Sequence, residues 1–377
     1  MDPNRNEGEQ NAKFWLFTEI FDKEFNISIG FPRSDLCNEC ERFNTRIILA
    51  TQNNERGQLE ELKTQQTQHW IDAEHFRNSM TQAKQLEENH FSFCFDFEKN
   101  FVLPITGIGR EYFCSHLNVY NLGFQNLQTD DSVMCMYPQN FAHKAANEVC
   151  SLFLWYVRNH VPQNIQHLHI FSDNAVGTNK NRFIFTICQY LCLTRFVSIK
   201  FDFPVPGHSF MCIDRSFALI EKKKKREDRV IAPSTWTNLV VKTRPSNPFH
   251  LVYVEKPFTD DLTPNEVPVV RVKDFKSRFI PIFQNRLFIN GIRAFSFSNV
   301  LTPTIARNYG EECVKPLNLF LPNASARQIV EATENAKFLY QEDTFLPVPR
   351  AAAEGCTQVL DHVVIPPNVT FFNSIQP

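Results

Sequence analysis

The chain has 377 residues, of which 43% are hydrophobic, so it can bury a sizeable core as one large domain or two ordinary ones. Its net charge of -2 gives no global attraction to nucleic acid or membrane, and any polyanion binding has to come from a local patch. The beginning, MDPNRNEGEQNAKF, lacks the apolar core of a signal peptide, and no run of about 18 apolar residues is present, so we expect a nuclear or cytoplasmic protein that is not secreted.

The first ninety residues are polar and helical in pattern. Residues 1–32 form a polar N-terminal segment, and residues 33–90 are a Cys-x-x-Cys and helical region with apolar residues loosely at helical spacing. A helical stalk or hairpin is expected. Cys37 and Cys40 in SDLCNECERF are half of a tetrahedral zinc site, with His69 and His75 as candidate partners. The alternative is two free thiols at a helix start.

Residues 91–229 are predicted to form the core domain. Alternate phenylalanines of FSFCFDF share one face of a strand, and Asp96 lies on the other. Strands are expected next in YFCSHLNVYNLGF and SVMCMYP, followed by a helix at 142–159, a strand at 165–173, a helix at 181–193, a strand at 196–205 and a helix at 211–226. The order β-β-β-α-β-α-β-α predicts an α/β fold with a mixed, ribonuclease-H-like sheet and helices on its faces.

The proline-rich remainder has a different pattern. Fifteen of the 22 prolines lie from Pro233 onward, which predicts irregular structure with short strands. Residues 230–300 are interpreted as an accessory C-terminal region, and residues 301–377 as an extension of unknown fold.

Two aspartates belong to the strands of the core. Asp96 lies within the first strand, where a carboxylate among so many apolar residues is costly unless it is paired or bound to a metal. Asp173 ends the fourth strand, which neighbours the first in a sheet of this order. We therefore expect the two carboxylates side by side, binding Mg²⁺ or Mn²⁺ through their oxygens. The alternative for Asp173 is a turn and helix-capping role.

Three further acids and a histidine are candidates for the same site. Helical spacing puts Asp214 and Glu221 on one face of the helix at 211–226, and either of them would supply the third metal ligand. Glu148 interrupts the apolar stripe of the helix at 142–159; the alternative is a boundary glutamate that reaches water. His208 would orient a water molecule or accept a proton, or else cap backbone groups of its loop.

Two segments are interpreted as nucleic-acid contacts. The turn after Asp173 contains small residues that leave room for a bulky substrate, and its expected contacts are Asn174, Asn179 and Lys180. A basic run that would track phosphates follows the last predicted helix and consists of Lys222, Lys223, Lys224, Lys225 and Arg226. Such a run is also typical of a solvated helix face or a nuclear-import signal.

Several blocks carry a resemblance to a known kind of family: FDFEKNFVLP, LNVYNLGF, ANEVCSLFLWYV, HIFSDNAVGTNKN, PGHSFMCIDRSFALIEK and PSTW. In this order they resemble a family of uncharacterised animal domains that looks like a transposon-derived, ribonuclease-H-like (DDE/D transposase-like) module, over roughly residues 33–300. The region preceding that module in the family is also similar in having the DLCNEC pair followed by helices. The turn at 175–178 departs from the family, which favours a Cys-Gly-Gly-Gln type of turn where this chain has AVGT.

The predicted function is therefore transposase-like, metal-dependent phosphoryl transfer on nucleic acid, with DNA cleavage or strand transfer at a two-metal carboxylate site. The expected partner is nucleic acid, with DNA as the expected kind, and no membrane partner is expected. The expected cofactors are Mg²⁺ or Mn²⁺ and, at the cysteine pair, Zn²⁺. A ribonuclease or exonuclease on the same fold is an alternative. Another is a domesticated, catalytically inactive module that binds nucleic acid or protein, which the near-neutral charge favours.

Overall fold

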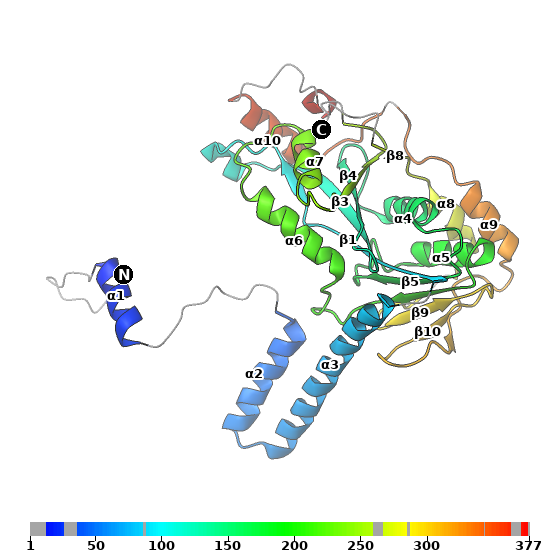
Figure 1. Ribbon diagram of the computed structural model, residues 1–377, viewed down its shortest axis with the longest axis horizontal. Coiled ribbons are helices and arrows are strands. Elements are labelled where there is room, and N and C mark those ends of the chain that lie inside the picture. The colour runs from blue at the N-terminus through cyan, green and yellow to red at the C-terminus, as the bar shows by residue number, and fades with distance from the viewer. Residues whose placement is uncertain are drawn as a thin grey trace.

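The computed structural model describes residues 13–25, 36–85, 88–258, 267–284, 287–342, 344–362 and 371–375. Its framework is one mixed sheet, in which the described strands number 11 (Figure 1). Their order from edge to edge is β11-β10-β9-β6-β5-β1-β3-β4-β7-β8, with β2 paired to β3. The prediction of an α/β chain with a mixed sheet and helices on its faces is confirmed.

Five strands form the centre of the sheet, close to their predicted positions: β1 (His90–Phe97), β3 (Leu117–Asn126), β4 (Ser132–Pro138), β5 (His167–Ser172) and β6 (Ser198–Asp202). The first three pair antiparallel, and β5 and β6 run parallel to β1. The expected contact between the first and fourth strands is confirmed by the pairing of β1 with β5. The sequence did not indicate β2 (Phe101–Leu103), and Tyr112 and Phe113, expected in a strand, belong to the 3-10 helix η1 (Gly109–Phe113).

Helices cover both faces of this centre. The alternation in β1 separates them, because Phe93 and Phe95 pack against Phe153 of α4 whereas Cys94 belongs to the core under α6. The phenylalanine face carries α4 (Ala146–His160) and α5 (Arg182–Thr194), and the opposite face carries α6 (Cys212–Lys224) and α7 (Pro233–Val241). A Cβ on Gly123 of β3 would lie 2.8 Å from the Phe217 ring, so glycine is what lets α6 lie this close to the sheet.

The C-terminal residues contain the expected short strands, and these strands extend the same sheet. β7 (His250–Val254) and β8 (Val269–Val270) continue it beyond β4, and β9 (Ala294–Phe297), β10 (Thr304–Ala306) and β11 (Lys315–Pro316) continue it beyond β6. The remaining helices are α8 (Phe275–Phe279), η2 (Ile280–Ile282), α9 (Ala326–Glu334), α10 (Arg350–Leu360) and η3 (Phe371–Ser374). The sheet therefore crosses both expected boundaries, at residues 229 and 300.

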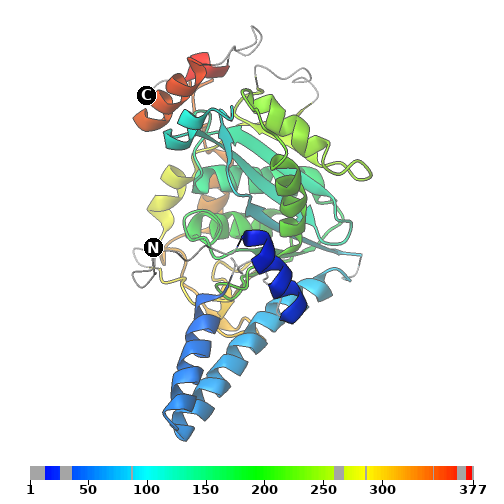
Figure 2. The ribbon, with the colours of Figure 1, turned by 90° about the vertical axis from the view of Figure 1, so that its left-hand side faces the viewer.

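The predicted helical hairpin is present. α2 (Asn38–Gln52) and α3 (Arg56–Ala83) lie side by side and project away from the sheet (Figures 1 and 2). Their contact buries Phe43, Ala50 and Leu62, and the far end of α3 enters the core under α6, where Phe76 packs edge-on against Phe171. The polar N-terminal segment contains one described helix, α1 (Phe14–Glu24). Across the described ranges, no helix is both long and apolar enough to cross a membrane.

Candidate functional site

Asp96 and Asp173 meet at the side chain of Asn179. The two aspartates come from adjacent parallel strands, because Asp96 is near the end of β1 and Asp173 directly follows β5. The amide nitrogen of Asn179 donates to the Oδ1 atom of Asp96 at 3.1 Å and to the Oδ1 atom of Asp173 at 2.6 Å. Asn179 is fully buried and its own Oδ1 has no hydrogen-bond partner. The Asn179 amide therefore holds both carboxylates together at the C-terminal ends of β1 and β5.

Asp214 faces this pair from the first turn of α6. One of its oxygens accepts the backbone N–H of Met211 at 2.6 Å, so the carboxylate caps the start of its own helix. The same position gives Asp214 an electrostatic interaction with both Asp96 and Asp173. All three aspartates keep part of their surface exposed, so the group is open to solvent.

The three carboxyl groups disfavour one another's charged form. Burial and then the charge of Asp173 raise the pKa of Asp96 well above its usual range. Burial also raises the pKa of Asp173, against hydrogen bonds from Ala175 and Asn179 that lower it. The pKa of Asp214 is raised by burial and by Asp173, against the Met211 N–H. Such mutual repulsion is what a bound cation would relieve.

Lys144 is a cation near this group that the sequence did not single out. It interacts electrostatically with Asp96 and Asp173, and partial loss of hydration lowers its pKa although much of the side chain is exposed. Its ammonium group lies 4.5 Å from the ring centroid of Phe97 and donates to the Oδ1 atom of Asn100 at 3.2 Å. Since the side chain is exposed, it can meet an anion that approaches the aspartates.

Glu221 and Glu148 lie elsewhere, which corrects two expectations. Glu221 pairs with Lys224 at 2.8 Å, near Glu98, further along α6 than Asp214. Glu148 accepts the Tyr340 hydroxyl and the His143 N–H, and its helix packs on the phenylalanine face of the sheet, opposite α6. Neither belongs to the aspartate group, so Asp214 is the helical acid that does.

Glu98 is a buried carboxyl group that the sequence analysis missed. Only 2% of it is exposed, and burial raises its pKa to about 8 although Asn121 donates to it at 2.7 Å. Its position two residues after Asp96 was the available signal, because alternate residues of a strand share a face.

The turn residues predicted to contact nucleic acid are engaged inside the protein. Lys180 is 2% exposed and donates to Asn174 at 2.8 Å and to the Ile292 carbonyl at 2.6 Å, and its burial lowers its pKa to about 7. Asn174 donates to the Pro204 carbonyl, and Asn179 serves the two aspartates. The interpretation of these side chains as nucleic-acid contacts is therefore corrected: they fix the turn.

The basic run is divided between surface and scaffold. Lys223 donates to the Lys242 carbonyl, and Lys224 donates to the Asn100 carbonyl at 3.2 Å while lying 4.5 Å from the Phe101 ring centroid. The side chains that stay exposed are Lys222, Lys225 and Arg226. The run lies at the opposite end of α6 from Asp214, about 12 Å or more along the helix at 1.5 Å per residue.

A second group of chemically reactive side chains joins the hairpin to the loop between β6 and α6. Cys37, Cys40, His69 and His208 each place one ligand atom within 4.8 Å of the other three, and among the described residues this is the one group of Cys, His, Asp or Glu that meets so closely. His208 was expected near Asp214 as a proton acceptor. Its Nε2 instead lies 3.1 Å from that of His69 and 3.3 Å from the Cys40 sulfur, so that expectation is corrected.

Residues 116–255 match a family model described as a domain of unknown function (DUF7869). The match begins just before β3 and ends just after β7, so it includes Asp173, His208 and Asp214 but neither Asp96 nor the cysteine pair. No curated protein and no solved structure matches the chain. The comparisons therefore assign no activity to the chain.

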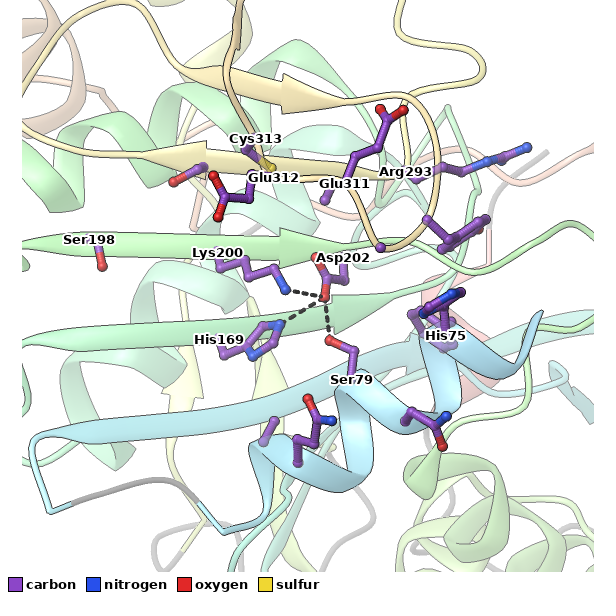
Figure 3. Close-up of a pocket in the computed structure, with 18 of the residues that line it drawn as sticks. His75, Ser79, His169, Ser198, Lys200, Asp202, Arg293, Glu311, Glu312 and Cys313 are labelled. Atoms are coloured by element: carbon purple, nitrogen blue, oxygen red, sulfur yellow. Dashed lines mark hydrogen bonds and ion pairs between the residues drawn. The ribbon is translucent and has the colours of Figure 1, made fainter. Parts of the chain in front are cut away.

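A cavity of about 710 Å³ lies between α3 and the strands β5, β6 and β9 (Figure 3). Asp202 is at the centre of its polar wall. The Oδ2 atom of Asp202 accepts a hydrogen bond from the Ser79 hydroxyl at 2.7 Å, and it lies 2.9 Å from the His169 Nε2 and 3.2 Å from the Lys200 ammonium. Burial would raise the pKa of Asp202, but these partners lower it. The interactions fasten α3 to the sheet, and none of the three aspartates lines this cavity.

Proposed function

We propose that this chain catalyses divalent-metal-dependent phosphoryl transfer on nucleic acid, with Asp96, Asp173 and Asp214 as metal ligands. One observation carries the proposal: Asp96 and Asp173 meet at Asn179 where two parallel strands end, and Asp214, at the start of α6, interacts electrostatically with both of them. Ligand sites of open α/β sheets lie at such strand ends.

The strand order supports the same proposal. The central strands run β4-β3-β1-β5-β6, with the meander on one side of β1 and the parallel strands on the other. Two crossover helices lie on one face and α6 on the opposite face. This arrangement agrees with the ribonuclease-H-like core that the resemblance implies, and it brings the first and fourth strands together with the last helix.

The donor set suits a hard divalent cation. Mg²⁺ and Mn²⁺ take carboxylate oxygens and retain several waters, and the three aspartates offer oxygens with exposed surface beside them. A bound divalent ion would activate a water or 3′-hydroxyl as nucleophile and stabilise the leaving oxygen of the phosphodiester.

The protein's own residues have separable roles in this proposal. Asp96 and Asp173 hold the charge that the cation neutralises, and Asn179 fixes their positions. Asp214 completes the group from α6. Lys144 would bind a phosphate oxygen, because its exposed ammonium group lies beside the aspartates without an ion-pair partner among the described residues.

The first test is calorimetric titration of Mn²⁺ into the wild type and Asp173→Asn. We expect saturable binding in the wild type and at least about a tenfold loss of affinity in the variant, which is 1.4 kcal/mol. Asp361→Asn is the matched control, because Asp361 is exposed at the end of α10. No saturable binding in the wild type, with or without an oligonucleotide, would overturn the proposal.

A binding module without catalysis is the second candidate, and specific observations favour it. Asp214 already uses one oxygen to cap its helix, and the three carboxylates do not approach one another as closely as the Cys/His group does. The assay that separates the candidates combines Mn²⁺ with DNA and RNA oligonucleotides. Cleavage or strand transfer that Asp173→Asn abolishes supports the enzyme, whereas metal-independent oligonucleotide binding that survives this substitution supports the module.

A further inference from the structure

We propose that Cys37, Cys40, His69 and His208 bind one structural zinc ion that fastens the α2–α3 hairpin to the loop preceding α6. The inference is independent of phosphoryl transfer, because none of these residues belongs to the aspartate group. It concerns a complete Cys₂His₂ ligand set assembled from three separate parts of the chain.

The distances fit a tetrahedral zinc ion. Zn–N and Zn–S bonds of about 2.0 to 2.3 Å put neighbouring ligand atoms of a tetrahedron roughly 3.3 to 3.8 Å apart. In this structure the Cys37 sulfur lies 3.3 Å from the His69 Nε2, and the Cys40 sulfur lies 3.3 Å from the His208 Nε2. The two histidine nitrogens are 3.1 Å apart. All four ligand atoms lie within 4.8 Å of one another, and the 3.1 Å between the nitrogens is slightly shorter than a bound ion would set. A set of four protein ligands leaves no open coordination position, which is typical of a structural site.

Local structure explains how the two cysteines face one ion. Cys37 is the N-cap residue of α2 and Cys40 lies in its first turn, so a spacing of three residues puts both sulfurs on one face of the helix. His69 lies on α3, whose antiparallel packing beside α2 brings its ring within 6.1 Å of the Phe43 ring. The hairpin alone thus supplies three ligands.

Gly207 allows the fourth ligand to arrive. Its φ of +81° is in the left-handed region that glycine adopts without strain, and a Cβ there would lie 2.9 Å from the Cα, Cβ and Sγ atoms of Cys37. The turn therefore presses directly against Cys37, and the next residue, His208, reaches the group.

The surroundings favour metal over free thiols. Cys37 is 6% exposed, and its sulfur also contacts the Pro206 carbonyl at 3.5 Å. Two thiols and two imidazoles packed this closely would compete as donors and acceptors, whereas zinc takes two thiolates and two neutral imidazoles and releases two thiol protons. The chemistry of the donors selects zinc over Mg²⁺ or Ca²⁺, which prefer oxygen.

The ion would join elements that are far apart in sequence. His208 is 139 residues from His69 and 168 from Cys40, and six residues after His208 the chain reaches Asp214 in α6. Zinc binding would therefore hold the base of the hairpin against the loop from which α6 begins.

The test is the metal content of the purified full-length chain, measured by elemental analysis after gel filtration. We expect about one zinc ion per chain and a visible d–d spectrum of tetrahedral type when Co²⁺ replaces it. Cys40→Ser and His208→Ala should lower zinc affinity more than about 100-fold, beyond the loss caused by removing a supporting residue.

Two matched controls distinguish ligation from general damage. His75→Ala removes an exposed histidine of α3, the helix that contains His69. Cys114→Ser removes a partly exposed cysteine outside the group. Both variants should retain zinc. Circular dichroism shows whether each variant is folded. Zinc loss in His75→Ala equal to that in His208→Ala, or zinc retained in folded Cys40→Ser and His208→Ala, would overturn the proposal.

A measurement on the wild type avoids variants that fail to fold. Alkylation followed by mass spectrometry should label Cys37 and Cys40 only after zinc is chelated, whereas Cys114 should be labelled with or without chelator. A wild type without stoichiometric zinc, or a Cys37–Cys40 disulfide in its place under reducing purification, would overturn the zinc site.

Discussion

The carboxyl group of Asp96 is destabilised in its charged form by burial and by Asp173. In the proposed enzyme, the repulsion between Asp96 and Asp173 favours binding of a cation. In the metal-free protein, the same repulsion lowers the stability of the fold. Asn179 limits that cost by donating to both aspartates from a single buried amide. A neutral isostere at position 96 should therefore separate stability from metal binding.

Asp96→Asn is expected to stabilise the metal-free protein at pH 7, because it removes a charge that burial and the neighbouring Asp173 disfavour. A carboxyl group whose pKa is raised by folding binds its proton more tightly in the folded chain, so the wild type loses stability as pH rises above the usual Asp value of 3.8. The difference in stability between Asp96→Asn and the wild type should grow above pH 3.8 and vanish below it.

Urea unfolding across this pH range, with chelator present, measures the difference. Saturating Mn²⁺ should reverse the order, since the wild type alone gains from the cation. A variant that is less stable than the wild type at pH 7 without metal would show that Asp96 is satisfied by its neighbours and is not a repelled ligand.

Among the elements, the loop between β6 and α6 has two tasks: it brings His208 to the cysteine pair and starts the helix of Asp214. Gly207 stands at its tightest point. Gly207→Ala should cost the strain of a positive φ, about 1–2 kcal/mol, and in addition the contact with the Cys37 backbone. Zinc affinity should fall with it, because the turn can no longer press against Cys37.

Gly291→Ala provides the control for that substitution. Gly291 has a φ of +80°, almost the same as Gly207, but nothing lies within 4 Å of a Cβ built there. It should therefore cost backbone strain alone and leave the zinc content unchanged. Equal losses of stability and zinc in the two variants would show that contact with Cys37 plays no part.

Local patterns predicted the elements better than the site. Period-two alternation in β1 correctly placed Asp96 opposite the phenylalanines, and the order of elements placed β1 beside β5. Helical periodicity also put Asp214 and Glu221 on one face, but seven residues at 1.5 Å each separate them by about 10 Å, so only Asp214 is at the aspartate group. Periodicity defines a face and not a position along it.

The remaining site features depend on contacts that no local pattern contains. Polar turn residues usually face water, yet Lys180 is buried because the Ile292 carbonyl, 112 residues later, receives it. His208, which meets the cysteine pair, is more distant still, 168 residues after Cys40. A zinc site was predicted from the Cys-x-x-Cys spacing alone, with His69 and His75 as candidate partners and without His208.

At the scale of the whole molecule, the C-terminal residues are part of the main core. The cluster that contains Phe93 and Phe95 also contains six buried side chains from beyond residue 300, including Ile305, Leu319, Phe320 and Ile329. Proline-rich sequence concealed this, because strands of two to four residues carry too few alternating positions to show a period.

A chain ending at residue 300 should therefore fail to fold cooperatively. Each buried apolar side chain contributes about 1.5–3 kcal/mol, so losing four of them removes an amount comparable to a typical net stability of about 5–15 kcal/mol. Removal of β10 also exposes the edge of β9 to intermolecular pairing. Gel filtration and thermal unfolding by circular dichroism should show aggregation and no sharp transition.

The control is a chain of residues 36–377, which lacks α1. The residues of α1 enter none of the core clusters, so this chain should melt as the full protein does. A 1–300 chain that is monomeric and melts cooperatively would instead support a domain boundary at residue 300.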